Sequence, residues 1–136
     1  MEEYIKYIIV SFIILVLDGI WIYNNLSMYS NAVKFVQKTN LIANYYYAAV
    51  AYILVLFASL YVAIPFTKLH LKKQDGIKEK LYKSLIYGGA VGFSIYGLYN
   101  FTSLSIYKDY PLSVGVIDTL WGTLLNTIVV FIYSLL

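Results

Sequence analysis

The stretch VGVIDTLWGTLL, residues 114–125, places an aspartate and a tryptophan inside an otherwise apolar run. The same spacing occurs near the other end of the chain in LVLDGIWIY, residues 15–23. Apolar runs of this kind are typical of helices that cross a membrane, where a charged side chain is costly. The runs therefore indicate the fold, and the two Asp-x-x-Trp motifs (Asp18 with Trp21, Asp118 with Trp121) indicate a candidate site.

Composition assigns the chain to the integral membrane proteins. Of its 136 residues, 61% are hydrophobic and 12% are charged, and its mean hydropathy is +0.72. This leaves too little polar surface for a soluble domain of this size. Cysteine is absent, which excludes a disulfide framework and a thiolate metal site. The net charge of +3 is too small, and too confined to the links between apolar runs, to favour nucleic-acid binding.

Four segments have the length of about 20 residues that a hydrocarbon core of about 30 Å requires. Each is predicted to be helical, because lipid offers no hydrogen-bond partner to an open backbone and the alternation typical of a barrel is absent. The first is interpreted as a retained span, because no small-x-small cleavage site follows it. Pro65 is expected to end the second span and Pro111 to occupy the first turn of the fourth. The prediction is one all-α domain over residues 1–136, a four-helix transmembrane bundle with spans at about 5–23, 41–66, 81–104 and 111–136.

Lysine distribution predicts the orientation of the bundle. Seven lysines lie on one side of the predicted membrane and three on the other. The positive-inside rule then predicts both termini and the lysine-rich link on the cytoplasmic side, whichever membrane is involved. The lone histidine, His70, lies in that link and is interpreted as a solvated side chain. The seven lysines are Lys6, Lys68, Lys72, Lys73, Lys78, Lys80 and Lys83, and the three are Lys34, Lys38 and Lys108.

With this orientation, three spans bring polar side chains to one depth. Asp18 and Asp118 are expected about 8 and about 10 Å below the far surface at the helical rise. No lysine lies within reach, so a buried carboxyl there must be protonated, hydrogen-bonded or neutralised by a bound cation. Trp21 and Trp121 can donate indole N–H groups. The third span contributes Tyr96, Tyr99, Asn100 and Thr102, of which Asn100 and Tyr99 are the expected hydrogen-bond partners.

Other interpretations of these residues stay open. Asp118 also fits the N-cap of a helix over residues 119–136. The polar cluster also fits a purely structural role, holding the helices in register, in place of a ligand, proton or ion site. Gly88 and Gly92 form a Gly-x-x-x-Gly pair that is expected to pack a helix closely, either within the bundle or between two copies of the chain.

An enzyme is not expected. No Gly-rich phosphate loop, Ser/His/Asp set or zinc-ligand spacing is present in the sequence, so no cofactor and no metal site is predicted. An intramembrane enzyme that uses the two aspartates as acid and base is the least supported of the hypotheses.

The region GFSIYGLYNFTSLSIYKDYPLSVGVIDTLWGTLL, residues 92–125, resembles domain of unknown function 2177, a family of small four-span predicted membrane proteins. The resemblance covers nearly the whole chain. It implies a four-span bundle of bacterial or viral origin and no established activity. Ser103 stands where the family pattern has Asn, and Tyr110 where it has Trp. The matching positions are Leu17, Asp18, Trp21, Tyr96, Asn100, Thr102, Pro111, Asp118, Trp121 and Gly122.

Two functions follow from this sequence. The first is a multi-pass membrane protein with an intramembrane acidic site that binds or conducts a proton, a small cation or a small polar ligand. The alternative is a structural membrane subunit of a larger assembly, such as a respiratory complex or the inner membrane of a virion. The expected partners are the lipid bilayer and either a second copy of the chain or the subunits of that assembly. The candidate site residues are Asp18, Trp21, Tyr99, Asn100, Asp118 and Trp121.

Overall fold

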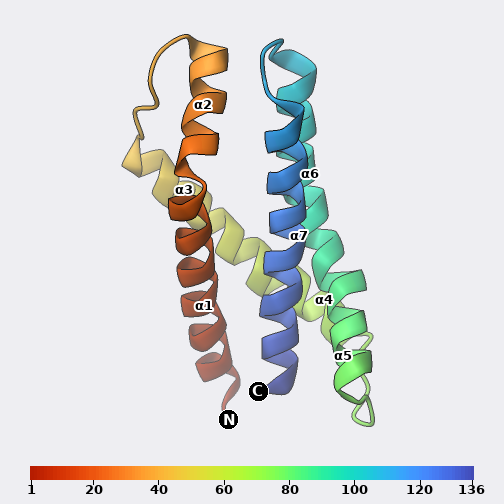
Figure 1. Ribbon diagram of the computed structural model, residues 1–136. Helices are drawn as coiled ribbons and strands as arrows, with labels where there is room; N and C mark the ends of the chain where they lie inside the picture. Colours follow the sequence, from red (N-terminus) through yellow and green to blue (C-terminus); the bar gives the residue numbers. More distant parts are fainter.

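A computed structural model describes all 136 residues, and its regular structure is entirely helical (Figure 1). Two segments are π-helical, with a wider turn than an α-helix. Lys38, with φ of 60°, ends the second helix in the left-handed region. The elements are α1 (Glu3–Asn24), α2 (Leu26–Gln37), α3 (Tyr45–Phe57), η1 (Ala58–Ala63), α4 (Ile64–Lys68), α5 (Ile77–Lys83), η2 (Ser84–Gly89), α6 (Ala90–Ile106) and α7 (Leu112–Leu135).

Three helical segments are long and apolar enough to cross a membrane: Glu3–Asn24, Tyr45–Lys68 and Leu112–Leu135. The second of these combines α3, η1 and α4. The predicted span of residues 81–104 lies within the helical run formed by α5, η2 and α6, which is not one of the three.

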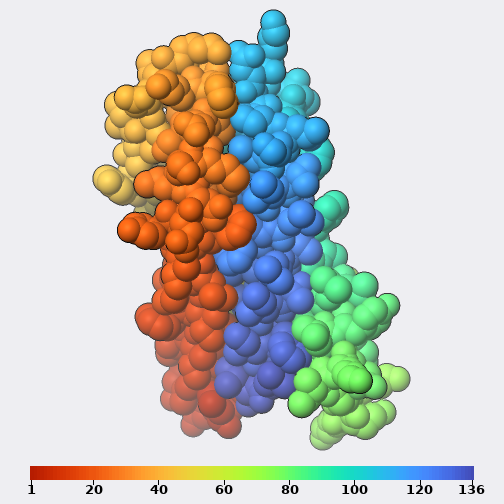
Figure 2. Space-filling view, viewed as in Figure 1, coloured from red at the N-terminus to blue at the C-terminus, as the bar shows by residue number.

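The helices are arranged so that both termini and the α4–α5 link lie at one end of the molecule (Figure 1). The end of α2 and the α6–α7 link lie at the opposite end. Helix α7 lies between α1 and α6, and α3 crosses them obliquely. In the most apolar stretch of α7, half of the residues are buried inside the protein. The corresponding share is 17% for α1 and for the segment Tyr45–Lys68, so α7 is the central helix. In the space-filling view, α1 and α2 lie against α7 (Figure 2).

Glycines allow α6 to approach α7 closely. A Cβ on Gly92 would collide with the carbonyl group of Gly122, and a Cβ on Gly122 would collide with the ring of Tyr96. One turn away, a Cβ on Gly88 would lie 2.8 Å from a methyl group of Val130. The predicted packing glycines Gly88 and Gly92 therefore face α7 of the same chain in this structure.

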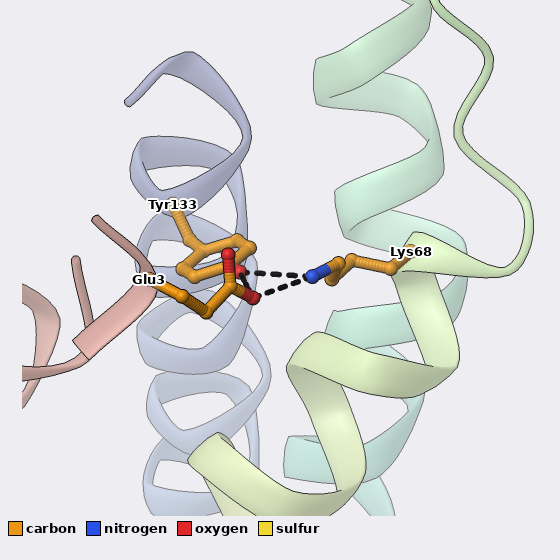
Figure 3. A network of polar contacts seen from close by, with 3 residues as sticks. All are labelled: Glu3, Lys68 and Tyr133. Carbon is orange, nitrogen blue, oxygen red and sulfur yellow. Dashed lines mark hydrogen bonds and ion pairs between the residues drawn. The ribbon is translucent and has the colours of Figure 1, made fainter. Parts of the chain in front are cut away.

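The apolar core fills the half of the bundle nearest the termini. It joins α1 to η1, α4 and α7, and it comprises Val10, Ile14, Ala63, Ile64, Leu125, Val129, Val130 and Tyr133. A polar cluster closes this end (Figure 3). Lys68 Nζ lies 2.6 Å from Glu3 Oε1 and donates to the Tyr133 hydroxyl at 3.1 Å, and that hydroxyl donates to Glu3. Because Lys68 and Glu3 are both about half exposed, this ion pair adds little stability.

Most buried serine and threonine hydroxyl groups inside the helices are satisfied locally; the exception is Ser59 of η1, which donates to Asn126 Oδ1 of α7 at 3.0 Å. Thr67, Ser84, Thr119 and Thr127 each donate to the backbone carbonyl four residues earlier, at 2.7 to 2.8 Å. This pattern removes the need for a partner elsewhere in an apolar surrounding.

Two boundary predictions differ from the structure. Pro65 does not end the second span, because α4 continues to Lys68. A proline ring crowds the carbonyl group one turn earlier, and the wide π-helical turn η1 directly precedes α4. Pro111 is the N-cap of α7 and lies one position before its first turn.

The structure also contains a helix, α2, in the link that separates the first two predicted spans. Its sequence, LSMYSNAVKFVQ, repeats apolar or aromatic residues at helical spacing: Leu26, Tyr29, Val33 and Val36. Only Asn25 separates it from α1. Helical structure therefore continues after α1 through α2, beyond the end of the first predicted span at about residue 23.

Candidate functional site

The two Asp-x-x-Trp motifs meet where the antiparallel helices α1 and α7 lie side by side (Figure 1). A separation of three residues keeps an aspartate and its tryptophan on one face of a helix. The indole rings of Trp21 and Trp121 stack with their centroids 4.5 Å apart and their planes 2° apart. Asp18 and Asp118 are 7% and 9% exposed, so both carboxyl groups lie inside the bundle.

Each aspartate is linked to the tryptophan of the opposite motif. Trp121 Nε1 donates to Asp18 Oδ1 at 2.8 Å. Trp21 Nε1 donates to the Tyr29 hydroxyl at 2.8 Å, and that hydroxyl donates to Asp118 Oδ1. The two motifs thus form a crossed pair, with Tyr29 of α2 as an intermediary on one side.

Helix α6 supplies the second donor to Asp118. Asn100, which is fully buried, donates from Nδ2 to Asp118 Oδ2 at 2.7 Å and to the Tyr96 carbonyl at 2.9 Å. Its Oδ1 accepts from the Tyr110 hydroxyl at 2.9 Å. Burial raises the pKa of Tyr110 to about 12, so this hydroxyl keeps its proton at neutral pH and can donate it.

The position of Asp118 decides between its two predicted roles. Helix α7 begins at Leu112 with Pro111 as its N-cap, so Asp118 lies about 9 Å into the helix. Its carboxylate bonds to side chains of α2 and α6 and caps no helix. The N-cap interpretation is therefore wrong.

The two carboxylates have no basic partner. The ion pairs of the structure are Lys38 with Asp109, Lys68 with Glu3, and Lys83 with Asp75. All three pairs lie at the two ends of the bundle. Within a membrane-spanning bundle, acidic residues without a neutralising lysine are expensive to maintain, which makes them a functional-site hypothesis.

A cavity of about 520 Å³ opens beside the carboxylates. Asp18 and Asp118 both line it, and the other 12 of its 14 lining residues are aliphatic residues or tyrosines. Its walls come from α1, α2, the α2–α3 link, α3, α6 and α7. Four of these twelve residues are tyrosines: Tyr29, Tyr52, Tyr96 and Tyr99.

A second cavity, of about 390 Å³, adjoins the first. Tyr29, Leu41 and Tyr99 line both of them. The second cavity also reaches Tyr107 and Tyr110 near the α6–α7 link. The two cavities together therefore extend from the carboxylates toward the end of the bundle that carries this link.

The predicted polar residues of the third span separate into two groups. Asn100 lies against Asp118, whereas Tyr99 lines the cavity wall and its hydroxyl donates to neither carboxylate. Thr102 is exposed, while Ser103 is buried. Helical periodicity accounts for the difference, because Asn100 and Ser103 share one face with Tyr96 and Thr102 does not.

Two residues of the site, Tyr29 and Tyr52, are absent from the sequence prediction. Tyr29 lies in α2, and the amphipathic spacing of that helix was the available signal. Tyr52 lies in α3 among aliphatic and small residues, and nothing in its sequence context distinguishes it from the other tyrosines of the chain.

A family model described as Predicted membrane protein (DUF2177) matches residues 3–134. This match confirms the family resemblance inferred from the motifs. No curated protein and no solved structure matches the chain.

Proposed function

The chain belongs to this family of predicted membrane proteins, and we propose that it is a four-span bundle whose buried acidic layer binds a positively charged or polar ligand. Asp18 and Asp118 are the charged groups of the proposed site, and Asn100 orients Asp118. One observation carries the proposal: two buried carboxylates without a basic partner line a single cavity of about 520 Å³. Cavities of this size and lining are typical of small-molecule sites.

Packing alone does not account for the aspartates. On insertion scales each costs about 2.5 to 3.5 kcal/mol at the centre of a membrane helix. An asparagine at position 18 could accept the same hydrogen bond from Trp121 without that cost. A function that requires negative charge would explain why aspartate is present.

The four-span topology rests on two supports. Residues 77–106 are helical throughout, and η2 and α6 pack against α7 across Gly88 and Gly92. The lysine-rich link lies at the same end of the molecule as both termini, as a protein with an even number of spans requires (Figure 1). We propose that this end is cytoplasmic, because seven of the ten lysines belong to it.

The topology can be tested by cysteine labelling without background, because the chain contains no cysteine. Single cysteines at Gln74 and at Lys108 should react with a membrane-impermeant maleimide from opposite sides of the membrane. In right-side-out vesicles, labelling at position 108 and protection at position 74 are expected. Labelling of both positions from one side would contradict the four-span arrangement.

Ligand binding can be followed through intrinsic fluorescence. The chain has two tryptophans, and both lie in the site, so tryptophan emission reports on the site alone. The purified protein in neutral maltoside micelles would be titrated with H⁺, Na⁺, K⁺, Mg²⁺ and alkylammonium salts. The proposal predicts a saturable change with at least one of them that is lost in Asp18→Asn.

The control is Asp109→Asn, which removes an exposed carboxylate at the end of the bundle and should leave the titration unchanged. Circular dichroism on each variant shows whether the fold is retained. The structural alternative predicts a different result. Asp18→Asn would then lower the thermal midpoint, and no titrant would give a saturable, Asp18-dependent signal.

A further inference from the structure

The volume and the lining of the large cavity favour one class of cationic ligand over others. Resting on the proposed function, we infer that its occupant is an amphiphilic ammonium compound, in which a positively charged amine is joined to an apolar body. The amine would lie against Asp18 and Asp118, and the apolar body against α3. Three independent features of the cavity support this assignment.

The first feature is volume. About 520 Å³ is many times the roughly 30 Å³ share of a water molecule in the liquid. A bare metal ion would leave most of this space empty. A hard cation such as Ca²⁺ also takes about six to eight oxygen ligands, and no group of three or more acidic or histidine side chains is present to hold one. The cavity therefore suits an organic cation better than an inorganic one.

The second feature is charge and its aromatic surroundings. The cavity wall contains two carboxylates and no lysine or histidine. Trp121 donates to Asp18 Oδ1 at 2.8 Å, and the Tyr52 hydroxyl is a further neighbour of the same carboxyl group. No fully buried side-chain oxygen or nitrogen lacks a hydrogen-bond partner, so Asp18 Oδ2, which accepts no bond in the hydrogen-bond network, is at least partly accessible. Asp18 itself lines the cavity. Four tyrosine rings line the same space, and aromatic rings beside a carboxylate are the usual surroundings of a bound ammonium group.

The third feature is the apolar part of the wall that α3 contributes. Ala48, Ala51 and Val55 of α3 all line the cavity, and their spacing of three and four residues places them on one helical face. The small alanine side chains leave room that a leucine would fill. A hydrated inorganic ion gains nothing from such a wall, whereas an alkyl chain does.

The adjoining cavity extends this apolar space. It shares Tyr29, Leu41 and Tyr99 with the first cavity and continues past Val33 and Val36 of α2. A chain longer than the first cavity would therefore continue between α2 and α6, toward the α6–α7 link.

The test uses n-alkylammonium ions of increasing length, with neutral alcohols of equal length as controls, and tryptophan emission in maltoside micelles as the readout. Affinity should rise about fourfold for each added methylene until the cavity is full, from about 0.8 kcal/mol per buried CH₂. The alcohols partition into micelles but carry no charge, so they should give no saturable change. In Asp18→Asn, affinity for each amine should fall at least tenfold.

A matched pair of variants tests the apolar wall independently of Asp18. Ala51→Leu fills the cavity, whereas Ala49→Leu changes the same helix at a position that does not line it. Affinity for long-chain amines should fall in Ala51→Leu and stay unchanged in Ala49→Leu. This pair keeps the proposal testable even if Asp18→Asn fails to fold.

Two negative results are distinguishable. If Na⁺, K⁺ or Mg²⁺ gives an Asp18-dependent signal and long-chain amines bind no more tightly than methylammonium, the ammonium assignment is overturned while the proposed function stands. If no titrant gives an Asp18-dependent signal, both are overturned.

Ammonium groups reach a membrane site from two sources, free amines and lipid headgroups. Nanodiscs of phosphatidylglycerol, which lacks an ammonium group, would be compared with nanodiscs that contain phosphatidylethanolamine. If the lipid is the occupant, tryptophan emission should differ between the two, and the ethanolamine lipid should weaken the binding of added amine. If a free amine is the occupant, its affinity should be the same in both. The chemistry assigned to the site is the same in the two cases.

Discussion

The indole ring of Trp121 lies flat against that of Trp21 and donates its N–H to Asp18, which is located one turn before Trp21 on the opposite helix. Stacking and hydrogen bonding thus join the same two helices through one side chain. The reverse link, from Trp21 toward Asp118, passes through the hydroxyl of Tyr29. The crossed pair is therefore asymmetric, and the asymmetry predicts unequal effects of mutation.

Trp121→Phe should destabilise the protein more than Trp21→Phe. Both changes keep an aromatic ring at the stack, but the first removes the 2.8 Å hydrogen bond from Trp121 to the buried Asp18 carboxyl, which costs about 1 to 3 kcal/mol. After Trp21→Phe, Asp118 still accepts from Tyr29 and Asn100. Thermal midpoints in maltoside micelles measure the difference. Equal midpoints for the two variants would mean that the Trp121–Asp18 bond contributes no more stability than the Trp21–Tyr29 bond.

Glycine substitutions should separate close packing from helix propensity. Gly92→Ala should destabilise the α6–α7 contact by more than 3 kcal/mol, roughly the upper range for overpacking, because its Cβ meets the rigid Gly122 carbonyl. Gly19→Ala on α1 has nothing within 4 Å of its new Cβ, so its effect should stay within about 1 kcal/mol. Unfolding followed by circular dichroism measures both. A mild effect of Gly92→Ala would show that α6 and α7 lie farther apart than described.

Tyr29→Phe should loosen α2 without disturbing the rest of the bundle. The hydroxyl of Tyr29 accepts from Trp21 and donates to Asp118, so its removal leaves an unpaired indole N–H and one carboxylate oxygen without a donor. A loss of about 1 to 3 kcal/mol is expected. The emission of Trp21 should also change, because its hydrogen-bond acceptor is lost. Tyr45→Phe, at an 83% exposed position, is the matched control and should have no effect.

The fold class and the grouping of the polar residues can be predicted from the sequence, whereas the individual side-chain contacts cannot. The helical class and the membrane location follow from apolar runs of suitable length, because lipid leaves a chain few other options. The grouping of Asp18, Asn100 and Asp118 followed from counting residues along antiparallel helices. Depth alone, however, could not decide which side chains touch. It suggested Tyr99 as a partner for the carboxylates, whereas the donor in the structure is Tyr29.

Helix α2 illustrates why the remainder was not predicted. A hydropathy window registers long apolar runs, and α2 is a short helix with polar residues on one face. Its amphipathic spacing is present in the sequence, but 12 residues are too few to span a membrane, so the segment reads as part of the link between two spans. The π-helical segments η1 and η2 have no sequence signature comparable to a cap or a proline. They depend on how α3–α4 and α5–α6 pack against α7, which a single sequence does not contain.

An ion pair made by the α4–α5 link, which lies outside the membrane-spanning segments, should make the stability of the protein depend on pH. Lys83 Nζ donates to Asp75 Oδ2 at 2.6 Å, and the backbone N–H of Lys72 donates to the same oxygen at 2.7 Å. These contacts, with the Lys83 hydrogen bond first, lower the pKa of Asp75 below its ordinary value of 3.8. A carboxyl whose pKa is lower in the folded state stabilises the fold above its unfolded pKa. The contribution should therefore be complete above about pH 5 and be lost as the pH falls through the folded pKa of Asp75.

Asp75→Asn should lower the thermal midpoint at neutral pH. Under strongly acidic conditions the wild type loses the same contribution, so the midpoints of the two proteins should converge. Thermal unfolding of both proteins across the acidic range measures this convergence. In a Lys83→Met background, the same Asp75→Asn change should have a smaller effect, because the charged partner is already absent. A constant difference between wild type and variant at every pH would contradict the assignment of this pH dependence to Asp75.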